Sequence, residues 1–187
     1  MKIEFVCTVM EQYSHLDWLF WMDTDALFMN MQISLTQLLA GVKETELIII
    51  AADAEGINAG TFFIRNTRAG RDFCKELLKQ QSKYSYEQQA MSATYNKAVE
   101  DSGQHCVVGE RDNLRLPSGI KACLHQKAPG FRILRLCAMG SWAGLEWKHG
   151  HGYYFDGVYM NGDFIIHFPG DRRVKLSLMK WALSGRL

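Results

Sequence analysis

Residues 16–31, LDWLFWMDTDALFMNM, constrain the fold of this chain more than any other stretch. The apolar and aromatic run over residues 18–22 has the composition of a strand buried on both faces. The run stops at two acids one residue apart, Asp23 and Asp25. In an open α/β sheet, ligands bind at the carboxyl ends of the strands. The pattern therefore predicts an α/β protein in which a strand delivers charge to a ligand-binding edge.

The two acids also limit the chemistry of that edge. Carboxylates are hard oxygen ligands for Mg²⁺ or Mn²⁺, and such metals keep coordination positions that phosphate oxygens fill. The alternative is a solvated turn, in which Asp23 and Asp25 only cap the segment that follows the strand. Both interpretations stay open, because an isolated pair of this kind does not separate them.

A histidine offers a third ligand for the same metal. His167 ends the short apolar run 164–166 and precedes a turn at residues 169–170, so its setting resembles that of the two acids. Two Asp and one His suit Mn²⁺, although His167 could equally be a strand-end histidine with ordinary hydrogen bonds. His149 and His151 are weaker metal candidates, because they lie in a glycine-rich segment.

Length and charge limit the partners. The 187 residues are enough for one domain with a sizeable core. The 21 Lys and Arg residues nearly balance the 20 Asp and Glu residues. We therefore expect no nucleic-acid partner and no attraction to an anionic membrane. An anionic ligand must be held locally, and the forked side chains of Arg172 and Arg173 suit phosphate oxygens. We find no membrane-span or signal-peptide pattern, so we expect a soluble chain without an anchor.

The cysteines give a weaker prediction. They are scattered without a CxxC pair, which argues against a zinc site or a dense disulfide framework. Their odd number leaves at least one thiol without a partner in the chain. We expect most of them to be small buried apolar residues, and the redox compartment stays undecided. The five are Cys7, Cys74, Cys106, Cys123 and Cys137.

Helical and strand patterns alternate along the chain without an internal repeat or a linker. Helices are predicted over residues 3–14, 34–41 with Ser34 as the cap, 66 or 67 to 78 with Asn66 or Thr67 as the cap, 86–99 and 174–183. Strands are predicted over residues 18–22, 47–52, 61–65, 105–108, 113–116, 131–136 and 163–168, with a loop over 53–60. Residues 140–162 mix glycines with aromatics, which suits either a loop over a ligand such as a sugar or an irregular surface loop.

Four sequence blocks in order carry a family resemblance. They are WMDTDALFMNM, INAGTFFIRNT from Ile57, YEQQAM from Tyr86 and GDFIIHFPGDRR from Gly162. Together they resemble the motif blocks of glycosyltransferase family 34, the retaining α-galactosyl-, α-mannosyl- and xyloglucan α-xylosyltransferases. The resemblance implies an α/β fold of the GT-A type, with a mixed, mostly parallel sheet flanked by helices. It also implies a nucleotide-diphosphate sugar as donor and Mn²⁺, or alternatively Mg²⁺, on its diphosphate.

The resemblance assigns the donor side of the site. Asp25 and His167 would bind the metal directly, and Asp23 would bind it or reach the ribose and the donor sugar. Arg172 falls where the family usually has a basic residue for the diphosphate. The segment Asn58, Ala59 and Gly60 would line the donor sugar and the acceptor.

The resemblance also assigns a catalytic pair. Glu87 and Gln88 fall where the family commonly has Asp-Gln beside the reacting carbon. The amide of Gln88 would stabilise the developing oxocarbenium ion or steer the acceptor. Glu87 departs from the family pattern, because it is longer than the usual Asp.

Three hypotheses follow. Because only 22 residues precede Asp23, we expect residues 1–187 to be a single catalytic domain lacking the first β-α units. The first hypothesis is a metal-dependent retaining enzyme that moves a hexose or pentose to an oligosaccharide, polysaccharide or glycoprotein glycan. The family implies a membrane-anchored parent in the Golgi lumen and leaves a homo-oligomer open. The second is an inactive or partial binding fragment of such an enzyme. The third, a haloacid-dehalogenase-type phosphotransferase, is disfavoured because Ala26-Leu27-Phe28 lacks the Thr or Val it needs.

Overall fold

The computed structural model describes residues 2–53, 56–106, 122–124, 126–139, 141–142, 159–168 and 172–184. The helices are α1 (Lys2–Gln12), α2 (Leu35–Leu38), α3 (Arg68–Gln81), α4 (Glu87–Asp101), α5 (Leu136–Met139) and α6 (Arg172–Leu183). The strands are β1 (Trp18–Met22), β2 (Ala26–Phe28), β3 (Ile48–Asp53), β4 (Gly56–Arg65), β5 (Phe131–Arg135), β6 (Ser141–Trp142) and β7 (Ile165–His167).

The strands form two sheets. The larger has the order β1-β4-β3-β5 and the smaller the order β2-β7-β6. The mixed sheet with flanking helices was predicted and is confirmed, but antiparallel pairs outnumber parallel pairs among the described strands. The prediction of mostly parallel pairing was wrong in this respect. Only two residues join β3 to β4, and parallel neighbours need a crossover of about a dozen residues or more.

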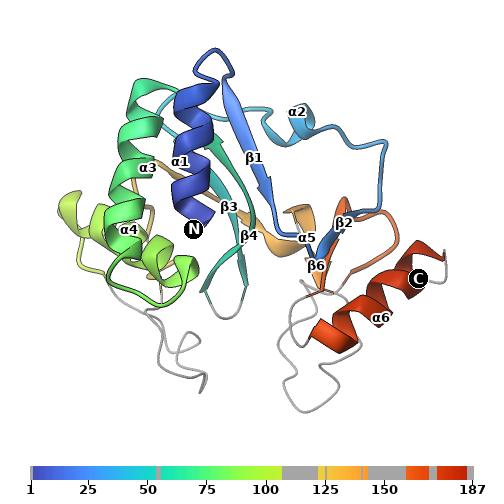
Figure 1. The fold of residues 1–187 in the computed structure, drawn as a ribbon. Coiled ribbons are helices and arrows are strands. Elements are labelled where there is room, and N and C mark those ends of the chain that lie inside the picture. The colour runs from blue at the N-terminus through green and yellow to red at the C-terminus, as the bar shows by residue number, and fades with distance from the viewer. Residues whose placement is uncertain are drawn as a thin grey trace.

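Three helices cover one face of the larger sheet. Figure 1 shows α1, α3 and α4 together on this side, with α1 beside α3. Side chains alternate across the sheet, so Ile48 and Ile50 of β3 face the helical layer while Ile49 packs in the cluster on the other side. Burial of α1 depends on Val6 and Met10, which lie four residues apart on its apolar stripe. The helical layer therefore fixes α1 against the sheet.

The strand β1 differs from its prediction. All five of its side chains are only partly buried, although the sequence predicted a strand buried on both faces. The reason is its place in the sheet, since β1 pairs with β4 on one side and is an edge strand of the described sheet. Apolar composition alone does not distinguish an edge strand from a central one.

Local sequence signals placed most helix starts correctly. Ser34 begins α2 with a capping box that includes Gln37, and Thr67 caps α3 through a bond from the Gly70 N–H. Gly41 ends the α2 region with a φ of 67°, a conformation that favours glycine. The predicted loop over residues 53–60 was wrong at Asp53, which ends β3, and over residues 56–60, which belong to β4.

Some predictions fall on residues that the structure does not describe. The predicted strand over residues 113–116 and most of the glycine-rich segment 140–162 lie outside the described residues. The predicted strand over 105–108 lies partly outside them, and its described residues are irregular. The sequence did not predict α5, β2 or β6. None of the helices in the described parts of the chain is long and apolar enough to cross a membrane.

Four of the five cysteines form disulfides. Cys7 of α1 bonds to Cys74 of α3, and Cys106 bonds to Cys123. The expectation that most cysteines are unpaired apolar residues was therefore wrong. Their Cα atoms lie 5.8 and 5.6 Å apart, which suits disulfide geometry. The sequence could not show this, because the fold brings Cys7 and Cys74 together across a separation of 67 residues.

We predict that the Cys7–Cys74 disulfide contributes more stability than the Cys106–Cys123 disulfide. The first closes 67 residues and the second 17, so loop entropy alone gives about 4 and about 3 kcal/mol, respectively. Urea unfolding of the two double Cys→Ser variants measures both contributions. A Cys7→Ser/Cys74→Ser variant as stable as the native chain would contradict this prediction.

Candidate functional site

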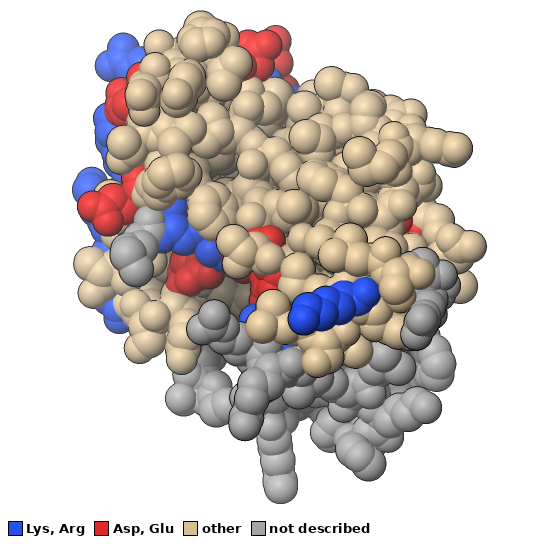
Figure 2. All heavy atoms as spheres, turned by 45° about the vertical axis from the view of Figure 1, so that its right-hand side comes forward, with Lys and Arg blue, Asp and Glu red and all other residues tan. Residues whose placement is uncertain are grey.

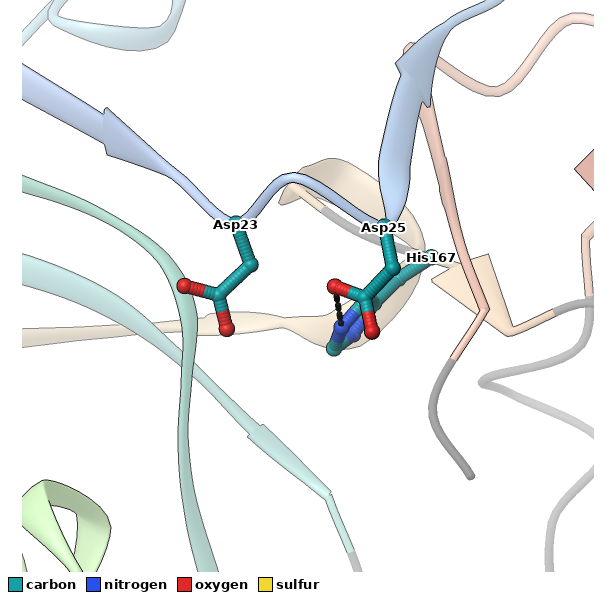
Figure 3. A group of neighbouring side chains, drawn as sticks. All are labelled: Asp23, Asp25 and His167. Carbon is teal, nitrogen blue, oxygen red and sulfur yellow. Dashed lines mark ion pairs between the residues drawn. The ribbon is translucent and has the colours of Figure 1, made fainter. Parts of the chain in front are cut away.

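The two acids lie where the chain passes from one sheet to the other. Asp23 follows β1, and its N–H donates to the carbonyl of Gly60 on β4, 2.8 Å away. The Ala26 N–H donates to the Asp23 carbonyl at 3.1 Å, which turns the chain directly into β2. Asp25 therefore lies at the edge of the smaller sheet, directly before β2. Figure 3 shows the Asp23 and Asp25 side chains pointing to the same side of this connection.

His167 reaches the acids through the smaller sheet. β7 pairs with β2 so that His167 lies opposite Ala26, and the Phe168 N–H donates to the Asp25 carbonyl at 2.8 Å. The imidazole Nε2 lies 3.3 Å from Oδ1 of Asp25, as Figure 3 shows. One ligand atom from each of Asp23, Asp25 and His167 lies within 4.8 Å of the others. These three side chains can therefore contact one metal ion.

The carboxyl group of Asp25 is held ionised. Burial raises its pKa, but hydrogen bonds from His167 and Lys175 outweigh that effect and hold the pKa well below its usual range. Lys175 of α6 places its Nζ 2.5 Å from Oδ2 of Asp25, while His167 faces Oδ1. Each oxygen of this carboxylate thus has a cationic or hydrogen-bonding neighbour.

Lys2, at the start of α1, contacts both Asp23 and Glu87. The Nζ of Lys2 lies 2.7 Å from Oδ1 of Asp23 and 2.6 Å from Oε1 of Glu87, and it donates to the Ala59 carbonyl at 3.0 Å. The indole Nε1 of Trp21 also donates to Oδ1 of Asp23, at 2.7 Å. Burial raises the pKa of Glu87, but the hydrogen bond from Lys2, a backbone hydrogen bond and nearby positive charge together outweigh this and lower it.

The predicted catalytic residue Gln88 contacts the predicted sugar-binding segment. The Ala59 N–H donates to Oε1 of Gln88 at 3.4 Å, and the Gly60 N–H donates to Oδ1 of Asn58 at 2.9 Å. Asn58 is 7% exposed, so this segment is part of the buried floor of the site. The start of α4 and the middle of β4 therefore meet beside the acids.

Gly60 lets the histidine approach the strand. A Cβ atom at this position would lie 2.6 Å from Cε1 and 3.0 Å from Nδ1 of His167. It would also lie 3.0 Å from Oδ1 of Asn58. Because real Cβ atoms do not approach so closely, the His167 ring can take its position only beside a residue without a side chain.

The structure brings together eight of the predicted site residues. They are Asp23, Asp25, Asn58, Ala59, Gly60, Glu87, Gln88 and His167. Arg172 begins α6, but its side chain, like that of Arg173, lies outside the described residues, as do His149 and His151. Figure 2 shows acidic and basic side chains close together near the middle of a largely uncharged face.

Sequence reasoning missed Lys2 and Lys175. A signal was present, because each lysine continues the apolar stripe of its own helix. Lys2 lies four residues before the buried Val6, and Lys175 lies three residues before the partly buried Leu178. A lysine in line with a buried stripe must meet a counter-charge, and here the counter-charges are the acids of the site.

The chain resembles known glycosyltransferases in both sequence and fold. Residues 1–44 match the galactosyl transferase GMA12/MNN10 family. A Schizosaccharomyces pombe (strain 972 / ATCC 24843) protein, described as an uncharacterized alpha-1,2-galactosyltransferase, is 31% identical over 126 residues. That alignment covers 49% of this chain and 34% of the relative, so the match spans about a third of the relative's length.

A solved structure resembles the fold. It is a glycosyltransferase involved in the glycosylation of the major capsid of PBCV-1, with a TM-score of 0.55 and 14% identity. The match covers 96% of this chain and 74% of that one. At this identity the likeness shows the fold, and it supports the predicted GT-A-like class. The family match over residues 1–44 and the Schizosaccharomyces pombe relative agree with the resemblance to glycosyltransferases that the motif blocks carry.

We predict that Gly60→Ala displaces the His167 ring from Asp25. The added methyl group overlaps the imidazole, so the free energy of unfolding should fall by about 1–3 kcal/mol in urea denaturation. In a His167→Ala background the same substitution should cost less, because the overlapping ring is gone. An equal cost in both backgrounds would mean that another group limits the space at residue 60.

Proposed function

We propose that this chain carries the donor site of a metal-dependent, retaining glycosyltransferase. It moves a hexose or pentose from a nucleotide-diphosphate sugar to a glycan acceptor with an α linkage. The observation that carries this proposal is the convergence of Asp23, Asp25 and His167 at one end of a site whose other end holds Gln88. A capping role for the two acids does not account for a buried histidine that contacts Asp25 and lies against Gly60.

The three ligands suit the metal that the family implies. Two carboxylates and an imidazole are a donor set for Mn²⁺, and the imidazole makes Mg²⁺ the second choice. When bound, such an ion neutralises charge on the diphosphate leaving group. Asp25 contributes an ionised carboxylate, because hydrogen bonds with His167 and Lys175 outweigh the rise in pKa that burial causes. The turn from Asp23 to Ala26 and the close approach at Gly60 orient the ligands before substrate binds.

Gln88 acts at the other end of the site. Its Oε1 accepts the Ala59 N–H, which anchors the amide to β4 and leaves the NH₂ group as the donor side. We therefore favour the role in which Gln88 steers an oxygen of the acceptor or of the leaving group. Glu87 is bound to Lys2, so its extra length compared with Asp serves this ion pair.

The donor sugar, the acceptor and the compartment follow less directly. The description of the Schizosaccharomyces pombe relative as an alpha-1,2-galactosyltransferase supports galactose as the hexose. The acceptor that the family resemblance implies is an oligosaccharide, polysaccharide or glycoprotein glycan. Two disulfides support an oxidising compartment such as the Golgi lumen, where membrane-anchored members of the family act.

The test is calorimetric titration of the chain with UDP and GDP, each with and without Mn²⁺. We expect one nucleotide to bind only with the metal, which would also identify the base of the donor. A folded chain that binds neither nucleotide would contradict the proposal. Donor binding without turnover would favour the alternative of a non-catalytic fragment.

We predict that Asp25→Ala and His167→Ala each abolish metal-dependent nucleotide binding. Both side chains contact the same ion in the proposed site, so the affinity should fall by more than about 100-fold in the same titration. Asp163→Ala is the matched control, because this acid lies near β7 but outside the ligand cluster. Full binding by either ligand variant would refute a shared metal.

We predict that Gln88→Ala lowers turnover far more than donor affinity. Loss of one donor to a charged transition state costs about 10²- to 10³-fold in kcat. Steady-state kinetics with the nucleotide sugar identified above gives kcat, and titration gives the affinity. A parallel loss in both quantities would make Gln88 a binding residue.

A further inference from the structure

The Lys2 side chain makes contacts that extend across the site. Its ammonium group meets Asp23 after β1, the Ala59 carbonyl on β4 and Glu87 at the start of α4. It also lies 5.5 Å from the centroid of the Trp21 ring, within the range of a cation–π interaction. With only 13% of the side chain exposed, the charge is largely removed from water. Such burial is tolerated because two carboxylates and a carbonyl compensate it.

The number of donors decides what Lys2 can do. An ammonium group has three N–H donors and no acceptor. Asp23, Glu87 and Ala59 supply three acceptors at 2.7, 2.6 and 3.0 Å. Lys2 therefore has its donors committed to the protein, which distinguishes it from a lysine that binds a substrate phosphate.

We propose that Lys2 is a positioning residue that couples the metal end of the site to the reacting end. The inference rests on the proposed function. Its ammonium holds Asp23 through Oδ1 and holds Glu87, which begins the helix that carries Gln88. Without this cation, two carboxylates that share one counter-charge would repel each other, and Gln88 would lose its position relative to the metal ligands.

The helix that carries Lys2 is fixed independently of the site. The Cys7–Cys74 disulfide joins α1 to α3. The ion pair between Lys75 and Glu11 spans the same two helices, but both side chains are more than half exposed, so it adds little to this support. Ile3, Val6 and Met10 are each 2% exposed or less, so the same helix is also packed in the core. This rigid support is what a positioning residue requires.

The experiment compares Lys2→Met and Lys2→Arg with a matched control. Lys75→Met also removes a lysine that pairs with a carboxylate across α1 and α3, but it lies outside the site. We expect Lys2→Met to lower kcat by about 10²-fold, the effect of a misplaced catalytic group, with less than about a threefold change in Mn²⁺-dependent nucleotide affinity. Lys2→Arg should restore part of kcat, and Lys75→Met should leave both quantities unchanged.

Two outcomes would overturn the inference. Equal losses of affinity and kcat in Lys2→Met would make Lys2 a ligand of the diphosphate. An unchanged kcat would show that the contact has no role in the reaction.

A second measurement does not depend on activity. A double-mutant cycle with Lys2→Met and Glu87→Gln, read by urea unfolding, should give a coupling free energy different from zero. If the native chain binds its nucleotide and the coupling free energy is zero, the inference is overturned while the proposed function stands. Absence of nucleotide binding by the native chain would instead overturn the proposed function, and with it the catalytic part of the inference.

Discussion

Charge balance around three partly buried carboxylates organises the site. Asp23, Asp25 and Glu87 have side chains that are 28, 17 and 26% exposed, so their charges are not fully solvated. Lys2 forms ion pairs with both Asp23 and Glu87, and Lys175 forms one with Asp25. Carboxylates so close together hold their positions only with such partners, because unpaired buried charges are costly. The first and last described helices, α1 and α6, are therefore both joined to the site by ion pairs.

The close approach of β4 and β7, at Gly60 and His167, is the second constraint on the geometry of the site. Asp23 is bound to the Gly60 carbonyl of the larger sheet, and Asp25 is bound to the Phe168 N–H next to the smaller sheet. Gly60 then allows His167 to lie directly over β4. The three candidate metal ligands thus lie where the two sheets meet, and their spacing depends on two backbone hydrogen bonds and on the absence of a side chain at Gly60.

Much of this arrangement could be predicted from the sequence. The apolar run before Asp23, the caps at Ser34 and Thr67 and the strand before His167 are local signals, and each matched an observed element. The motif blocks correctly grouped residues that lie up to 144 positions apart, such as Asp23 and His167. The sequence did not predict the properties that depend on neighbouring elements of the fold. Examples are the edge position of β1 and the pairing of Cys7 with Cys74.

The two lysines show why a motif gives an incomplete site. Asp23 and Glu87 stand out in the sequence because each belongs to a recognisable block, whereas Lys2 and Lys175 belong to helices whose patterns predict only packing. Both lysines nevertheless lie in line with buried residues of those helices, where a long cationic side chain has to find an acid. A lysine on the buried stripe of a predicted helix is therefore an indication of a nearby carboxylate. In this chain the nearby carboxylates are Asp23, Asp25 and Glu87 of the candidate site.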